Sequence, residues 1–154
     1  MSILDNLKKD HDKVREILKK TDILIEKYPN VDEEQEKKLM VKLMSELEPH
    51  NKAEEKVFYE ALRTKGKDSL KPYEGLEEHH LAMQVLKALQ KDTLEKSQRS
   101  AKIKVLKEIL LHHIEEEESK YFSEAKRCFT SEELRNLGEK FIEEKKKILK
   151  LSPS

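Results

Sequence analysis

The chain has 154 residues, a length typical of one domain and too short for two ordinary ones. Charged residues make up 42% of it, but 32 Lys and Arg balance 32 Asp and Glu, so the formal net charge is +0. That balance argues against a nucleic-acid-binding protein, which normally carries a basic excess. With only 3 glycines and 4 prolines, and with abundant Glu, Lys and Leu, the composition disfavours an all-β fold and favours helices.

No apolar run is longer than three residues, so the sequence predicts neither a membrane span nor a signal-peptide core. The single cysteine, Cys128, has no partner for a disulfide within the chain. Such cysteine usage is typical of a reducing compartment, and we therefore expect a soluble cytoplasmic protein.

Two long helices are predicted in the first part of the chain, because apolar residues repeat there every three and four positions. The first runs from about Ser2 to Tyr28 and ends before a proline. The second begins at Asp32, where Asp32 and Gln35 form a capping-box pattern, and it runs to about Thr64.

Two more long helices are predicted after residue 66. The third helix follows a turn at 68–69 and the breaks expected at Pro72 and Gly75, and it continues to about Thr93. The fourth spans about 97–128. Four long helices joined by short turns predict an all-α fold, an antiparallel up-down-up-down four-helix bundle.

A short additional C-terminal helix begins at the capping signal of residues 130–133 and ends near Leu151. We expect it to cap the bundle, with dimerisation as the alternative. The predicted organisation is one domain over 1–154, with the bundle at about 2–128 and the extra helix at about 131–151.

All six histidines fall inside predicted helices, and their spacing assigns each to a face. A helix buries one stripe at steps of three and four residues, so apolar neighbours at those steps mark an inward histidine. His80 and His112 lead onto charged or amide residues and are expected at the surface, although a small rotation would bring His112 to the edge of the buried set. Each long helix carries one inward histidine: His11, His50, His79 and His113.

Two of the inward stripes also carry a glutamate four residues after the histidine, Glu54 after His50 and Glu117 after His113. The height of these residues along the bundle gives an independent indication that they lie close together. At about 1.5 Å per residue, the inward histidines of helices one and two lie roughly 26 Å from the first turn, and those of helices three and four lie roughly 24 Å from the third. All six residues therefore fall in one layer, near the end that holds the second turn.

A lone inward histidine is usually a core residue that is hydrogen-bonded to its neighbours. Four histidines and two glutamates in one layer differ, because desolvated imidazoles and carboxylates without partners are costly to bury. A metal ion supplies that partner, and neutral imidazole suits Fe, Zn, Cu and Ni. Two glutamates that can bridge and two pairs of histidines fit two metal ions better than one, and iron is the expected metal.

The motifs around these residues resemble those of the hemerythrin-like (HHE cation-binding) family. An aromatic pair also follows each glutamate at a matching offset, at 58–59 and 121–122. Ferritin-like di-iron proteins need two Glu-x-x-His motifs, whereas this chain has one such spacing, Glu77 to His80, and its histidine faces outward. The resemblance covers roughly 1–128, and the matching stretches are Lys9-Asp10-His11, His50-Asn51-Lys52-Ala53-Glu54-Glu55, Glu77-Glu78-His79-His80 and His112-His113-Ile114-Glu115-Glu116-Glu117-Glu118.

The resemblance implies a non-haem di-iron centre, with two Fe ions bridged by Glu54 and Glu117. The implied terminal ligands are the inward histidines: His11, His50, His79 and His113. Oxygen-carrying hemerythrins have a further histidine where this chain has Met83, and an aspartate at five residues' spacing where it has a glutamate at four. The four-His/two-Glu set is similar to that of bacterial hemerythrin-like proteins and leaves coordination positions for water, O2, NO or peroxide.

Two classes of function stay open. The first is a di-iron protein that binds or reacts with O2, NO or peroxide in sensing or in a redox or stress response. The second is an iron-binding or iron-donating protein without catalytic turnover, so the sequence leaves open whether the chain is an enzyme. The expected partner is a small diatomic ligand or peroxide, with no nucleic acid and no membrane, and the chain is expected to be a monomer or a weak homodimer.

Two remaining features admit a structural reading. Tyr59 and Tyr121 are expected to pack in the core, with hydrogen bonding that tunes the metal as the alternative. The acidic residues Glu115, Glu116 and Glu118 are expected to form a solvated face.

Overall fold

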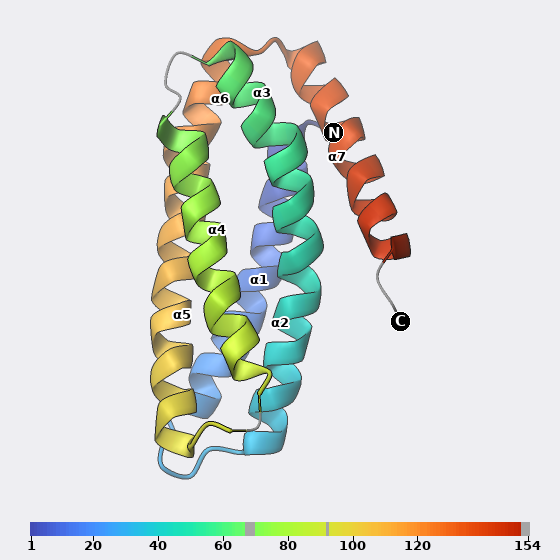
Figure 1. The fold of residues 1–154 in the computed structure, drawn as a ribbon. Helices are drawn as coiled ribbons and strands as arrows, with labels where there is room; N and C mark the ends of the chain where they lie inside the picture. Colours follow the sequence, from blue (N-terminus) through green and yellow to red (C-terminus); the bar gives the residue numbers. More distant parts are fainter. Residues whose placement is uncertain (67–69, 92, 152–154) are drawn as a thin grey trace.

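The computed structural model describes residues 1–66, 70–91 and 93–151. Four helical segments run side by side, and a fifth helix leans away from them (Figure 1). No strand is present in these ranges, and the predicted four-helix bundle with an extra helix is confirmed. In chain order the elements are α1 (Ile3–Ile25), α2 (Glu33–Glu54), η1 (Glu55–Tyr59), α3 (Glu60–Lys65), α4 (Leu70–Leu89), α5 (Lys96–Glu116), η2 (Glu117–Tyr121), α6 (Phe122–Cys128) and α7 (Ser131–Leu151).

Capping side chains fix where the helices begin. The Asp32 side chain accepts a hydrogen bond from the backbone N–H of Gln35 at the start of α2. At α7, Thr130 and Glu133 each accept a hydrogen bond from the other's backbone N–H, as the sequence predicted. The α1 helix ends at Ile25, slightly before the predicted end.

Pro72 and Gly75 do not break the third helix as predicted, because α4 already begins at Leu70 and runs through both. Pro72 lies in the first turn, where its missing N–H would have no helical acceptor. Gly75 is required by a tertiary contact, since a Cβ there would lie 2.5 Å from the Tyr59 hydroxyl oxygen. The helix ends at Leu89, earlier than predicted, and the predicted turn at 68–69 lies outside the described residues.

Two π-helical segments, η1 and η2, interrupt the second and fourth long helices at matching places. The first directly follows Glu54 and the second begins at Glu117. Such segments insert one extra residue into a helical turn and are frequent at functional sites. The insertion brings the aromatic five residues after each glutamate, Tyr59 or Phe122, toward the same face as that glutamate.

Two apolar clusters form the core, and a polar layer lies between them. On α1, for example, Leu7 belongs to one cluster and Val14 to the other, with the buried His11 between them. On α5, Leu110 and Ile114 of the larger cluster flank His113. The bundle therefore surrounds this layer with apolar packing above and below.

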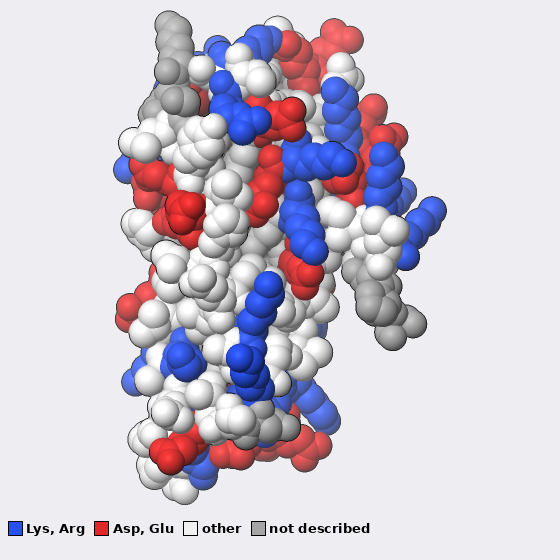
Figure 2. Space-filling model, viewed as in Figure 1, with Lys and Arg blue, Asp and Glu red and all other residues white. Residues whose placement is uncertain are grey.

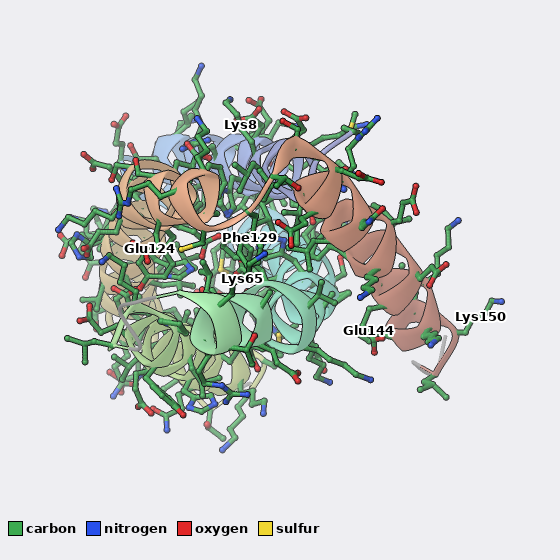
Figure 3. The ribbon with its side chains drawn as sticks, turned by 90° about the horizontal axis from the view of Figure 1, so that it is seen from above. Lys8, Lys65, Glu124, Phe129, Glu144 and Lys150 are labelled. Carbon is green, nitrogen blue, oxygen red and sulfur yellow. The ribbon has the colours of Figure 1, made fainter. Side chains whose placement is uncertain are left out.

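The α7 helix packs its N-terminal part on the bundle through Leu134 and Phe141, which join the smaller cluster. Its outer end extends away, and Lys150 lies far from the bundle when the molecule is seen from above (Figure 3). An ion pair of 3.1 Å between Lys56 and Glu144 ties η1 to the middle of α7. Within the described ranges, no helix is both long and apolar enough to cross a membrane.

Candidate metal centre

The structure brings together the six residues that the sequence singled out: His11, His50, Glu54, His79, His113 and Glu117. Each is at most 5% exposed. They come from α1, α2, α4, α5 and the start of η2, so every long helix contributes to one buried site. We call these residues the centre. Metal binding by these residues is still a prediction, and the geometry described next shows whether they are suited to it.

The centre divides into two overlapping groups that share Glu54 and Glu117. The first group adds His11 and His50, the second adds His79 and His113, and within each group the possible ligand atoms lie within 4.8 Å of one another. The two oxygens of Glu117 face different halves, one lying 3.2 Å from His11 Nε2 and the other 3.2 Å from His113 Nε2. A carboxylate placed in this way can bridge two cations.

Several polar atoms of the centre are buried and form no hydrogen bond: His11 Nε2, both carboxylate oxygens of Glu54, and Oε1 of Glu117. Unpartnered buried polar atoms are rare in folded proteins because each loses its hydration. A pair of cations between the glutamates would satisfy all of them. The donor set of imidazole nitrogen and carboxylate oxygen therefore fits the metal ions that the sequence predicts.

The outward nitrogen of every histidine in the centre faces a carboxylate. Because an ionised carboxylate only accepts, Nδ1–H donates, and Nε2 points inward, where it can present its lone pair to a metal ion once the imidazole is neutral. We call the four acceptors the carboxylate ring. The Nδ1–oxygen distances are 2.8 Å for His11–Glu118, 2.8 Å for His50–Asp10, 2.7 Å for His79–Glu55 and 2.8 Å for His113–Glu78.

Each ring carboxylate adjoins one residue of the centre in sequence and supports a histidine on another helix. Asp10, for example, precedes His11 on α1 but bonds to His50 on α2. The predicted solvated position of Glu118 is wrong, since it bonds to His11 and to Arg15, the latter over 2.6 Å. Apolar periodicity did not reveal the ring, because each of its pairs joins two different helices. The sequence did offer one signal, since every ring carboxylate is the direct neighbour in sequence of a residue of the centre.

The electrostatics of the metal-free centre follow from this packing. Burial by itself lowers the pKa of His50, but the carboxylates of Glu54 and Asp10 outweigh it and raise that pKa to about 10. His113 behaves alike: burial lowers its pKa, and the partners Glu117 and Glu78 raise it to about 10. Without metal, these two histidines are therefore positively charged at neutral pH and partly neutralise the glutamates.

The Tyr59 hydroxyl donates a hydrogen bond to Glu117 Oε2 over 2.7 Å and lies 3.4 Å from His79 Nε2. Tyr59 therefore does not only pack in the core as expected, because it also makes a hydrogen bond to the centre, the alternative that the sequence left open. Tyr121 packs in the smaller apolar cluster as expected. In the other half of the centre, Phe122 stacks on His11 with ring centroids 6.3 Å apart, so the two halves differ by a hydroxyl group.

A sequence model described as the hemerythrin HHE cation-binding domain matches residues 2–125. The chain belongs to this hemerythrin family. Comparison with curated proteins and with solved structures finds no match, so the assignment rests on the domain match. Membership implies non-haem metal binding, which agrees with the buried His/Glu groups.

The hemerythrin match ends before α7, yet α7 contacts the centre's surroundings. Lys145 Nζ lies 2.9 Å from Asp10 Oδ2, and Asp10 holds His50. The ring of Phe141 packs edge-on against that of His50 at 5.8 Å. The additional helix thus supports one histidine of the hemerythrin centre from outside the matched segment.

The histidines expected at the surface are there. The His80 side chain is 58% exposed and that of His112 is 65% exposed. His112 Nε2 lies 3.0 Å from Glu116 and 3.9 Å from Glu78, so these three form a separate outer group. The helix rotation that would have brought His112 into the buried set does not occur.

Proposed function

We propose that this hemerythrin-family chain holds two non-haem iron ions bridged by Glu54 and Glu117. In this proposal the loaded centre binds or reacts with O2, NO or peroxide, in sensing or in a redox or stress response. The observation that carries it is the pair of four-residue groups sharing both glutamates. A single ion would leave one pair of histidines without a role.

Iron suits the donors, because imidazole and carboxylate together are typical ligands of non-haem iron with open positions. Each ion would have four protein ligands, two histidines and the two shared carboxylates. When bound, iron supplies redox chemistry and coordination positions for a small ligand. The chain itself orients the imidazoles through the carboxylate ring and excludes bulk water by burying the centre.

Metal analysis of protein expressed with adequate iron tests this proposal. We expect two irons per chain, and visible spectra that change when O2, NO or peroxide is added. A stoichiometry near one, or a preference for zinc when iron is abundant, would count against the bridged centre. Spectra unchanged by all three additions would count against the reactivity.

The second candidate function is iron binding or donation without turnover. The outer group of Glu78, His112 and Glu116 favours it, because Glu78 also bonds to His113 and so connects the surface to the centre. Purified iron-loaded protein separates the two functions. Catalytic loss of peroxide or NO supports the first, and transfer of iron to a metal-free acceptor protein supports the second.

A further inference from the structure

The outer group of Glu78, His112 and Glu116 lies at the surface, outside the centre, and comes from two helices, α4 and α5. His112 Nε2 lies 3.0 Å from Glu116 Oε2 and 3.9 Å from Glu78 Oε2, and a ligand atom of each residue lies within 4.8 Å of the others. Donors about 2.1 Å from a shared ion at tetrahedral angles lie roughly 3.4 Å apart. The two measured distances bracket that value, so these atoms are spaced like the ligands of one ion.

The outer group repeats a ligand pattern of the centre one position earlier in the sequence. His112 and Glu116 are four residues apart, as are His113 and Glu117. The distances from Nε2 to the carboxylate are also similar, 3.0 Å in the outer pair and 3.2 Å in the inner pair. One His–Glu pair on a single helix is an ordinary surface contact, but Glu78 adds a third donor from the neighbouring helix.

Glu78 is held in position from the buried side. Its Oε1 accepts the hydrogen bond from His113 Nδ1 over 2.8 Å. Its Oε2 faces His112 Nε2 at 3.9 Å, which is too long for a hydrogen bond. The carboxylate is therefore already oriented toward the outer group, and little side-chain freedom is lost when an ion binds there.

The charge around the outer group favours a cation. Lys120 Nζ bonds to Oε1 of Glu116, the oxygen that does not face His112, over 3.0 Å. One ammonium and two carboxylates leave a net negative charge beside the imidazole, and Glu74 and Glu77 are exposed on the same helix as Glu78. Figure 2 shows acidic side chains over the upper part of α4, whereas Lys and Arg are more frequent over α2 and α7.

We propose that the outer group binds one divalent transition-metal ion, such as Zn²⁺ or Fe²⁺, at the surface between α4 and α5. An imidazole nitrogen with two carboxylate oxygens suits these ions better than Mg²⁺ or Ca²⁺, which prefer oxygen ligands. Three protein ligands leave coordination positions open to water, so this ion exchanges with solvent more readily than an ion in the buried centre. The inference does not depend on what the centre binds.

Glu78 connects the outer ion to the centre. A cation on Oε2 draws electron density from the same carboxylate that accepts the His113 Nδ1–H, and it thereby weakens that hydrogen bond. Hydrogen bonds of this kind set the orientation and basicity of a metal-binding imidazole. Occupancy of the outer group therefore alters one histidine of the centre.

Calorimetric titration of the metal-free full chain with Zn²⁺ tests the site. We expect His112→Ala to bind one zinc ion fewer than the unaltered chain, because the imidazole is the nitrogen donor. His80→Ala is the matched control and should bind as many as the unaltered chain. His80 is similarly exposed and lies 3.9 Å from Glu77, but among the described residues this pair belongs to no group of three donors. Equal zinc counts in all three chains, or an equal loss in both variants, would overturn the proposal.

Glu116→Gln separates a built site from general attraction to an acidic surface. The affinity for the zinc ion that His112→Ala loses should fall more than about 10-fold, because a ligand oxygen is replaced by an amide. Glu115→Gln removes the same charge at the exposed neighbouring position and should leave that affinity nearly unchanged. An equal fall in both variants would refute the site. Displacement of this zinc ion by a large excess of Mg²⁺ would refute the class of ion.

The iron-loaded chain tests the connection through Glu78. Added Zn²⁺ should shift the visible spectrum of the unaltered chain and leave that of His112→Ala constant. An unchanged spectrum in the unaltered chain, with zinc bound, would show that the outer ion does not act on His113. A chain that takes up no iron would refute the proposed function, while the zinc counts of the metal-free chain still decide the outer site.

Discussion

The Tyr59 hydroxyl is a proton donor that the fold keeps protonated. Burial and then the nearby carboxylates of Glu117 and Glu54 raise the pKa of Tyr59 well above 10.0. Its ring also stacks on that of His79, with centroids 5.3 Å apart. Tyr59 therefore fixes the position of the Glu117 carboxylate and limits the space in one half of the centre.

Removing this hydroxyl should loosen the metal without unfolding the chain. In Tyr59→Phe we expect iron retention against a chelator to fall about 10-fold, because the donor to Glu117 is lost. Tyr121→Phe is the matched control, since Tyr121 packs in the apolar cluster. Equal retention in both variants would show that the Tyr59 hydrogen bond does not support the metal.

The adjacent histidines give a second prediction at this scale. His79→Ala or His113→Ala should lose iron and bleach the visible spectrum, because each removes a proposed ligand whose Nδ1 is held by a carboxylate. His80→Ala and His112→Ala should keep near-normal iron content, since both side chains are exposed. Iron loss in His112→Ala with retention in His113→Ala would contradict the assignment and move the glutamate ligand to Glu116.

At the scale of elements, apolar periodicity and capping residues predicted the helices, while tertiary contacts decided their details. Gly75 reads as a helix breaker in sequence, but it accommodates Tyr59 from another helix. The π-helical segments add one residue to a long helix, which a period of 3.6 does not resolve. The facing of His11, His50, His79 and His113 could be predicted because it is a property of single helices. The carboxylate ring could not, because its pairs form between helices.

The α7 helix should stabilise the centre through Lys145. Burial acts to raise the pKa of Asp10, but the hydrogen bond and charge of His50, and after them those of the Lys145 ammonium, lower it to about 2. Lys145→Met should lower the free energy of unfolding by about 1 kcal/mol and speed iron loss to a chelator, measured by thermal unfolding and absorbance. Lys146→Met, at an exposed neighbouring position, is the control. Identical behaviour of the two variants would mean that the contact of Lys145 with Asp10 does not stabilise the centre.

At the scale of the whole molecule, metal content and pH should act together on stability. In the metal-free chain the pKa values of His50 and His113 are about 10, above the ordinary 6.5. Their contribution to stability is fully present below pH 6.5 and is lost as pH rises toward 10. Iron needs neutral imidazoles, so the loaded chain instead loses metal as pH falls.

The iron-loaded chain should therefore melt at a higher temperature than the metal-free chain, and the difference should widen as pH rises from 6 to 9. Calorimetry of both forms across this range measures it. Equal melting temperatures would argue that these residues are not ligands, and a difference that narrows with rising pH would contradict the assigned charges.

The carboxylate ring also bears on when a newly made chain becomes able to hold metal. The first hairpin contains the complete pair of Asp10 and His50, but His11 waits for Glu118, which is synthesised much later. Until residue 118 has left the ribosome, the His11 imidazole has no carboxylate to orient it. The shared Glu117 is then either absent or only just synthesised. A nascent chain thus offers scattered, poorly aligned donors to the metals of its surroundings. In the proposed two-iron centre, the complete set of ligands would form only when the two hairpins meet.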